Sequence, residues 1–463
     1  MKKSAKMLLL LCVLALLTGA YLLLPRLFAE EEPDDSIRLS DRSGSDLTAL
    51  SWTWQGESCT LTQQDGRWSV AADPDFPVDQ DRAVRMAEAA AVLKSSRELG
   101  DADRTQYGLD KPFLTVSASF AGGDVLELAF GDVSAITGEY YAECAGRVYL
   151  LDSAVPDAFS LHRLSLLSLT AGLPALSAPQ RLSLTGGGRE LTVEKHEEGG
   201  LWYSDQYQWF YPAGNRLHAA DTDTVSGLLS VLREPGYTSA VLYDADDAAL
   251  ESCGLGETAL RLSAADALEG EYSLLVGNET DDGFYARADG SRTVLLLPTD
   301  KARTLMSLDE NALCPDEVCR IPLNEVSELT ISVDGRSVTA AVSDEAVTAA
   351  GAESGEGEGD TEERVFVFRT DSGELDGTAL TLALSDIFML RADRTDGDGT
   401  KAGRELFSVC YRQAGREDLT LTLYAYDAEH CLAAFNGESR LLCGREKTEE
   451  IRELLAEIIV GYN

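Results

Sequence analysis

Histidine side chains carry much of enzyme acid–base and metal chemistry, and this chain has few of them. The 463-residue sequence contains four, which are His162, His196, His218 and His430. None has another histidine or a cysteine two to four positions away, the spacing typical of metal sites. The signatures of serine hydrolases, zinc proteases and phosphate-binding loops do not occur either. The sequence therefore predicts no catalytic residue, no metal site and no cofactor, and we expect a protein that is not an enzyme.

Two loop segments resemble ligand-binding loops in part. Four residues of the acidic segment 394–405 fit positions 3, 5, 6 and 12 of a calcium-binding EF-hand loop: Asp396, Asp398, Gly399 and Glu405. Position 1 would be Arg394, whose charge repels Ca²⁺, and we expect strands rather than helices beside the loop. The glycine run 185–189 joins two predicted strands, whereas a phosphate loop needs a helix directly after it. We therefore interpret the two segments as a solvated turn and a hairpin turn.

The nine cysteines bear on the redox chemistry of the chain. No C-x-x-C pair occurs, so neither a zinc ribbon nor a thioredoxin-like site is predicted. Cys314 and Cys319 flank a turn-forming Pro-Asp pair, and they form either a small disulfide loop or two free thiols. Cys59, Cys144 and Cys410 fall in alternating strand patterns, where a thiol serves as a small buried apolar side chain.

Aromatic residues are densest in the segment 202–211, which contains Trp202, Tyr203, Tyr207, Trp209, Phe210 and Tyr211. Aromatic rings with a polar group suit carbohydrate or protein recognition. They also suit a core between two domains, and we favour this second interpretation.

The N-terminal region predicts the location of the chain. Residues 7–24 are an unbroken apolar stretch, preceded by Lys2, Lys3 and Lys6 and followed by Arg26. About 20 apolar residues span a bilayer as a helix, and basic residues stay on the cytoplasmic side. We expect a single-pass anchor in the cell membrane, with the bulk of the chain extracytoplasmic. The alternative is a cleaved signal peptide.

Charge and composition limit the partners and the fold. A formal net charge of −40 repels nucleic-acid phosphates and anionic lipid heads, so we expect no nucleic-acid partner. Hydrophobic residues make up 44% of the chain, which is enough apolar material for packed cores.

The elements that would position a site are repeated along the chain. The segment YGLDKP around Gly108 corresponds to CGLGET around Gly254, and the strand that contains Gly131 corresponds to the strand that contains Gly277. Both glycine pairs are separated by 146 positions, which indicates a duplication. A third and more divergent copy lacks the Gly-Leu pair.

Each copy has the pattern of an α+β fold, with mostly antiparallel strands and one or two packed helices. Alternating apolar and polar residues mark the strands, and Gly56 and Asp65-Gly66 mark tight turns. The first long helix is predicted at 79–96, with Asp79 or Asp81 as its N-cap and with a buried face of Val84, Ala87, Ala91 and Leu93. Further helices are predicted at 153–160, 221–233, 376–389 and 446–459.

The predicted organisation is three tandem related units behind an anchor. The predicted boundaries are a membrane anchor at 1–29, a polar stalk at 30–46, repeat units at 47–165 and 178–310, and a divergent third unit at 324–463 that contains a disordered acidic loop at 346–364.

At the repeated motifs the chain resembles the domain-of-unknown-function family numbered 4340. In the first unit the matching features are Trp68, the Pro-Asp-Phe-Pro of 74–77, Tyr107 to Asp110 with Pro112, Gly131, Tyr140-Tyr141 and Val148-Tyr149. In the second unit they are Trp202, Gly254-Leu255, Gly277, Phe284-Tyr285 and Val294. The resemblance implies a membrane anchor and tandem α+β units. Relatives often look like auxiliary components of ABC-type transport systems, and the family has no agreed catalytic residues.

These patterns lead to one expected function and two alternatives. We expect a membrane-anchored extracytoplasmic accessory or binding protein, held by residues 7–24, with an ABC transporter permease or another envelope protein as partner. The alternatives are a structural or glycan-binding envelope protein and, less favoured, a cell-wall hydrolase.

Overall fold

The computed structural model describes residues 36–100, 104–196, 207–213, 216–319, 321–347, 363–436 and 438–462. The predicted anchor and the first six residues of the predicted stalk, 30–35, lie outside these residues. Within them, none of the helices is both long enough and apolar enough to cross a membrane. The chain divides into two compact parts, with the boundary between Ala171 and Gly172, and each part is described by itself.

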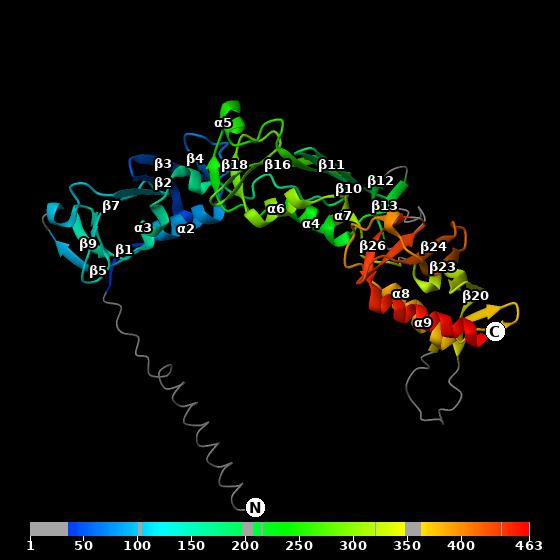
Figure 1. Cartoon of the computed structure of the whole chain (residues 1–463). Coiled ribbons are helices and arrows are strands. Elements are labelled where there is room, and N and C mark those ends of the chain that lie inside the picture. The colour runs from blue at the N-terminus through cyan, green and yellow to red at the C-terminus, as the bar shows by residue number, and fades with distance from the viewer. Residues whose placement is uncertain are drawn as a thin grey trace, which may run out of the picture. The chain divides into compact units, whose positions relative to one another are not determined.

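The first part is built on one antiparallel sheet of nine strands (Figure 1). The strand order is β1-β5-β9-β8-β7-β6-β2-β3-β4. Two-residue turns with positive φ, at Gln55-Gly56 and Asp65-Gly66, join β2 to β3 and β3 to β4, as the sequence predicts. The strands are β1 (Ile37–Asp41), β2 (Leu47–Trp54), β3 (Glu57–Gln64), β4 (Arg67–Val70), β5 (Val92–Gly100), β6 (Leu114–Phe120), β7 (Val125–Val133), β8 (Tyr140–Cys144) and β9 (Arg147–Leu151).

The second part contains two further antiparallel sheets. One has the order β13-β12-β11-β10-β15-β16-β17-β18-β14, and the other has the order β22-β21-β20-β19-β23-β24-β25-β26. The strands of the former are β10 (Pro179–Gly186), β11 (Arg189–Lys195), β12 (Trp209–Ala213), β13 (Arg216–Ala219), β14 (Ala240–Leu242), β15 (Leu260–Asp266), β16 (Gly270–Thr280), β17 (Gly283–Ala288) and β18 (Val294–Leu297). The strands of the latter are β19 (Val326–Val333), β20 (Arg336–Val347), β21 (Glu363–Thr370), β22 (Gly373–Glu374), β23 (Glu405–Gln413), β24 (Leu419–Ala425), β25 (His430–Phe435) and β26 (Glu438–Gly444).

All three sheets share one connectivity, which confirms an α+β fold of three related units. In each sheet an opening hairpin pairs with a later four-strand meander, through β2 with β6, β10 with β15 and β19 with β23. The meander of the first two units continues to one further strand, β5 or β14, and in the first unit β1 pairs beyond β5 at the edge. In the third unit the corresponding edge is reduced to the isolated bridge between Arg394 and Leu442.

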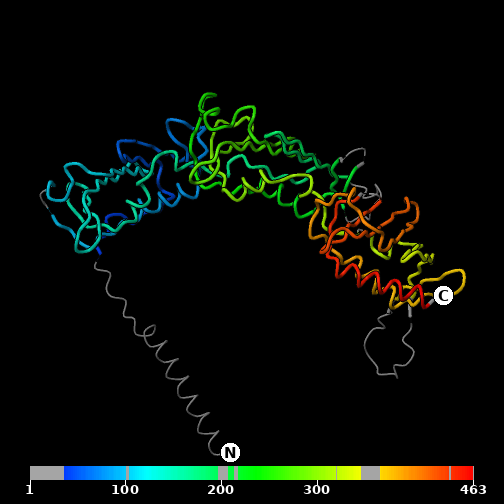
Figure 2. The backbone as a smooth tube through the Cα atoms, in the orientation of Figure 1, coloured from blue at the N-terminus to red at the C-terminus, as the bar shows by residue number. Residues whose placement is uncertain are grey.

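Helices pack beside the sheets, and their bounds follow the sequence closely. In the second part, α8 and α9 run side by side (Figure 2). The α-helices are α2 (Gln80–Ala91), α3 (Ala154–Phe159), α4 (Thr222–Arg233), α5 (Asp247–Ser252), α6 (Thr299–Ser307), α7 (Glu310–Leu313), α8 (Gly377–Met389) and α9 (Arg445–Tyr462). The short 3-10 helix η2 (Arg104–Tyr107) precedes β6.

The first long helix is shorter than predicted. Helix α2 begins at the N-cap Asp79, whose carboxylate accepts a hydrogen bond from the backbone N–H of Arg82 at 3.0 Å. It ends at Ala91, and the residues after it form β5, because β1 and β9 supply backbone partners on both sides. Val84 was predicted on the buried face but is 43% exposed; the helix instead packs through four alanines and Met86.

Two predicted irregular segments contain paired strands. Part of the predicted stalk forms β1, where Ile37 pairs with Ser95 on the free edge of β5. The predicted acidic loop is shorter at both ends, because Val347 pairs with Glu363. Its remaining residues, 348–362, lie outside the described part of the chain.

The second and third sheets share a hydrophobic core. The edge hairpin formed by β12 and β13, with Tyr207 just before it, contributes Tyr207, Phe210 and Ala219 to a buried cluster. The other members of this cluster come from the segment 318–321 and from the third unit. Phe210 is completely buried. The prediction that the aromatic segment is a core between two units is therefore correct for Tyr207 and Phe210, whereas Trp202 and Tyr203 lie outside the described residues.

Candidate functional site

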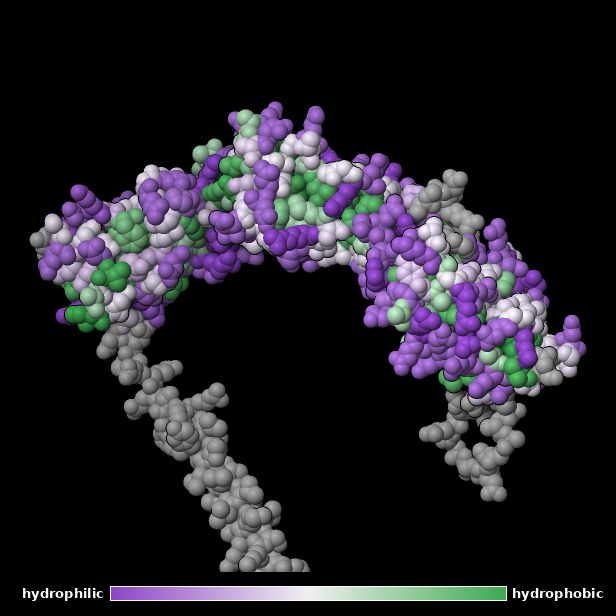
Figure 3. Space-filling model, in the orientation of Figure 1, coloured by the Kyte–Doolittle hydropathy of each residue, from purple (hydrophilic) through white to green (hydrophobic). Residues whose placement is uncertain are grey.

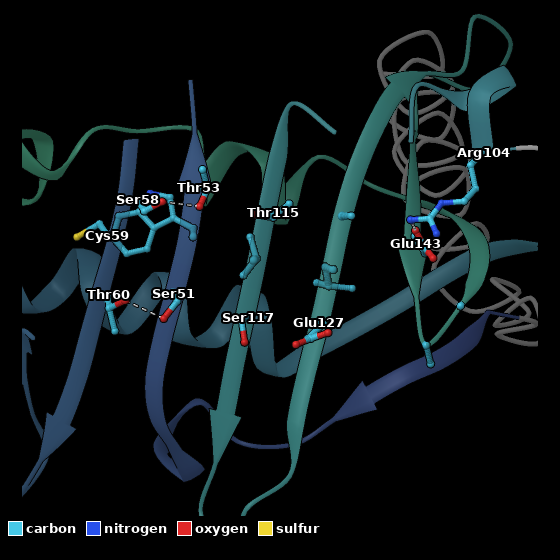
Figure 4. A pocket seen from close by; sticks show the side chains of 16 residues that line it. Ser51, Thr53, Ser58, Cys59, Thr60, Arg104, Thr115, Ser117, Glu127 and Glu143 are labelled. Atoms are coloured by element: carbon cyan, nitrogen blue, oxygen red, sulfur yellow. Dashed lines mark hydrogen bonds and ion pairs between the residues drawn. The ribbon is translucent and has the colours of Figure 1, made fainter. Parts of the chain in front are cut away.

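A groove of about 530 Å³ crosses the open face of the first sheet (Figure 4). Strands β2, β3, β6 and β7 form its floor, and β8 contributes to one side. Helix α2 packs against β2, β4 and β5 behind this sheet, and the groove lies in front of it. The open face therefore remains available for contacts with another molecule.

Hydroxyl side chains line the groove, because alternate residues of a strand point to the same face. On the opening hairpin, Ser51 Oγ lies 2.9 Å from Thr60 Oγ1, and Thr53 Oγ1 lies 2.8 Å from Ser58 Oγ. Strand β6 adds two more hydroxyl groups, those of Thr115 and Ser117. Since a hydroxyl both donates and accepts, each can still hydrogen-bond to a ligand.

Charged side chains lie at the other end of the groove. Arg104 of η2 forms an ion pair with Glu143 of β8. Glu127 of β7 lies opposite Ser117 in the strand register and is exposed. Among the residues that the structure describes, Glu127 makes no ion pair. The groove therefore presents one uncompensated carboxylate beside its row of hydroxyl groups.

The groove offers hydrogen bonds rather than a reactive group. Burial raises the pKa of Cys59 to about 11, so this thiol stays protonated at neutral pH and is a poor nucleophile. Trp52 contributes to the lining but is only 2% exposed, which leaves no aromatic platform for a sugar ring. The arrangement fits an extended polar ligand, such as a segment of polypeptide.

Comparison with known families assigns the chain as a whole. The family described as "Domain of unknown function (DUF4340)" matches residues 68–207 and again residues 209–365, which together are more than half of the chain. The chain belongs to the DUF4340 family. No curated protein matches this DUF4340 chain, and no solved structure matches it.

The repeated glycines of this DUF4340 chain lie against one another in space. Gly108 and Gly254 both have a φ of 71°, a left-handed conformation that favours glycine. A Cβ on Gly131 would lie 2.1 Å from the carbonyl oxygen of Tyr107, and one on Gly277 would lie 2.2 Å from that of Cys253. Gly131 and Gly277 lie at bulges within β7 and β16. These glycines allow the two backbone segments of each unit to approach closely.

Repeated tyrosines pack on the short helices that precede these glycines. Tyr141 lies 4.4 Å from Tyr107 of η2, measured between ring centroids. Tyr285 packs against a small core that contains Leu250 of α5 and Leu255. Tyr141 and Tyr285 therefore occupy equivalent positions against η2 and α5 in the first two units.

The four histidines of the DUF4340 chain do not converge on one site. His162 Nδ1 lies 2.5 Å from a carboxylate oxygen of Glu57, and its ring lies 4.7 Å from that of Trp54. His430 lies beside Asp427, with 3.1 Å between Nδ1 and Oδ1. His196 and His218 pack on neighbouring aromatic rings of β12, as their ring contacts show: His196 with Phe210 and His218 with Tyr211.

Acidic residues of the segment 394–405 form ion pairs with basic residues of the same segment. Arg394 donates two hydrogen bonds to the carboxylate of Asp396, at 2.9 and 2.7 Å, and these hydrogen bonds lower the pKa of Asp396. Asp398 accepts from Thr400 and pairs with Lys401. Across the described residues, no group of three or more histidine, cysteine or acidic side chains is placed to hold a metal ion.

The glycine run and the cysteine pair have structural roles. Gly186 pairs with Arg189, so the run forms the predicted hairpin turn between β10 and β11. Cys314 and Cys319 form no disulfide with each other, and Cys319 Sγ lies 3.5 Å from the buried hydroxyl of Tyr411. Cys59 and Cys144 are buried as predicted, whereas Cys410 is half-buried.

Reasoning from the sequence did not single out the groove. The signal was present as alternating hydroxyl residues on three strands, Ser51 with Thr53, Ser58 with Thr60, and Thr115 with Ser117. Within any one strand, this alternation predicts only a solvent-exposed face. The groove is apparent only once the sheet brings the three strands side by side.

Proposed function

We propose that this DUF4340 chain is an extracytoplasmic binding or accessory protein, anchored by residues 7–24, that serves an ABC-type transport system or another envelope assembly. The single observation that carries the binding role is the open, hydroxyl-lined groove on the first sheet. A partner that presents an extended polypeptide segment forms hydrogen bonds with the exposed hydroxyl group of Ser58 and with the other hydroxyl groups of the groove.

Three further observations support the proposal. The apolar stretch at 7–24 with its preceding lysines supports the anchor and the orientation. Family membership supports an auxiliary role, as the resemblance implies. The groove offers hydrogen-bonding side chains together with a thiol of raised pKa, which supports binding rather than catalysis.

Co-purification of the full-length tagged chain from its native membranes tests the proposal. The groove variant Ser58→Arg places a large cation in the groove and should abolish recovery of the partner. Ser337→Arg is a matched control, because Ser337 occupies the equivalent hairpin position of the third unit and pairs with Ser332 at 2.9 Å, as Ser58 pairs with Thr53 at 2.8 Å. Both variants should melt at the temperature of the unsubstituted chain.

Two results would overturn the proposal. The first is recovery of the same partners with Ser58→Arg as with Ser337→Arg. The second is protection of the folded region from a protease that is added outside intact cells, because the predicted orientation places all residues after 30 on that side.

A further inference from the structure

One end of the first sheet both receives the chain from its N-terminal region and presents apolar side chains. The strand register runs across the sheet from Ile37 through Ser95, Leu151 and Tyr140 to Val133. These residues therefore form one row, at which β1 begins and the β7–β8 loop opens. Four strand spacings separate the ends of the row, a distance of about 19 Å.

The β7–β8 loop in this row exposes unusual apolar surface. Ile136 at its tip is 95% exposed, and Val133 at its base is 49% exposed. Phe113 is 39% exposed and lies 5.7 Å from the ring of Tyr140, measured between centroids. Figure 3 shows apolar surface on the first part in the region where Figure 1 draws β1, β5 and β9.

The loop holds Ile136 outward in an ordered conformation. The backbone N–H groups of Ser134 and Gly138 donate to the carbonyls of Glu139 and Ser134, both at 2.8 Å. The hydroxyl of Ser134 also accepts from the backbone of Thr137 at 3.3 Å. These bonds already fix the backbone of the loop. A partner that covers Ile136 therefore loses little binding free energy to ordering the loop.

The second unit lacks this feature. Its corresponding loop consists of two residues, Asp281 and Asp282, whereas the β7–β8 loop has six. The apolar tip is therefore not a requirement of the fold. It is a property of the one unit that follows the predicted anchor directly.

The sequence brings this end of the sheet close to a bilayer. The twelve residues from Pro25 to Ser36 separate the apolar stretch from β1, and a chain of that length spans at most about 40 Å. A sheet end tethered so closely meets the lipid surface often. Isoleucine, valine, phenylalanine and tyrosine are suited to the boundary between lipid headgroups and acyl chains.

We propose that the β7–β8 loop, with Ile136 at its tip and with Val133, Tyr140 and the neighbouring Phe113 at its base, inserts into the lipid surface beside the anchor and seats the first unit on the membrane. The proposal rests on the anchoring part of the proposed function. Asp132 and Glu139 flank the loop, so the contact fits zwitterionic lipid and is weakened by anionic lipid. Apolar groups at such a surface sit about 5–10 Å deep.

Site-specific fluorescence quenching in lipid nanodiscs tests this contact. The full chain carries an environment-sensitive dye on Ile136→Cys, and the zwitterionic lipid contains a nitroxide near the top of the acyl chain. Val125→Cys is the matched control, because Val125 is 55% exposed at the opposite end of β7, about 27 Å away. Labelling of the unsubstituted chain gives the background from the native cysteines.

We expect quenching at position 136 to be several-fold stronger than at position 125, and to fall when anionic lipid replaces part of the zwitterionic lipid. Equal quenching at both positions would overturn the proposal. Weak quenching in nanodiscs with a blue-shifted emission in native membranes would also overturn it, in favour of a protein partner at the tip.

Alkaline extraction separates failure of the anchor from failure of the loop contact. If the chain washes off membranes at alkaline pH, the predicted anchor is wrong. If the chain stays on membranes and position 136 is not quenched, only the proposed loop contact is wrong.

Discussion

Single glycines determine how closely the backbone segments of the first two units approach. Gly131 and Gly277 each lie against a carbonyl oxygen that a Cβ would approach to within about 2 Å. The loop glycines Gly108 and Gly254 occupy the left-handed region in the same two places. A side chain does not fit at these close approaches, so each unit requires a glycine there. This requirement accounts for the equal spacing between the two glycines in the first and second units.

Substitution of Gly131 by alanine tests this steric requirement. Because the backbone carbonyl of Tyr107 must move, Gly131→Ala should lower the free energy of unfolding by about 1–3 kcal/mol or more. Gly227→Ala in α4 is the control, since a Cβ there meets no atom within 4 Å and should stabilise the helix by about 0.5–1 kcal/mol. Urea denaturation measures both, and equal effects of the two substitutions would refute the steric explanation.

At the scale of elements, the hairpin of β12 and β13 joins the second unit to the third. It is an edge hairpin of the second sheet, yet Phe210 and Ala219 belong to the core that the third sheet buries. Hydrogen bonds reinforce the junction, including Thr395 Oγ1 to the carbonyl of Asn311 at 3.0 Å. The second and third units are therefore expected to unfold together.

The substitution Phe210→Ala tests this coupling. Loss of a completely buried phenylalanine costs about 3–5 kcal/mol, and the cost should appear in both units that share the core. Hydrogen exchange is expected to become faster in β19 and β23 as well as in β10 and β15. Faster exchange confined to the second sheet would show that the third unit is independently stable.

At the scale of the whole molecule, the chain has three related sheets but two compact parts. The boundary after Ala171 separates the first unit from the second, whereas a common core unites the second with the third. Proteins with separate cores generally unfold in more than one transition.

Calorimetry of the full chain in nanodiscs tests this division. We expect two transitions, and Phe159→Ala, which removes a completely buried ring of the first unit, should lower the temperature of one transition and leave the other unchanged. Phe210→Ala should affect the other transition. A single transition that shifts with both substitutions would contradict the division.

The sequence by itself determined the features that depend on local chemistry. Strand alternation, Asp-Gly turns and capping aspartates are local signals. They correctly predicted the turn at Asp65-Gly66, and of the two predicted caps for the first long helix the structure has Asp79. The 146-residue spacing predicted the duplication, because the same steric requirement recurs at Gly131 and Gly277.

Only the tertiary structure decided the features that depend on partners distant in the sequence. Residues 92–96 continue the pattern of a helix, yet they form a strand because β1 and β9 lie on either side of them. The groove forms only where hydroxyl groups from three strands lie side by side. The apolar row forms only through the register of five paired strands. Such surfaces arise from how strands are paired, and strand pairing is set by the burial of whole sheets rather than by any local pattern.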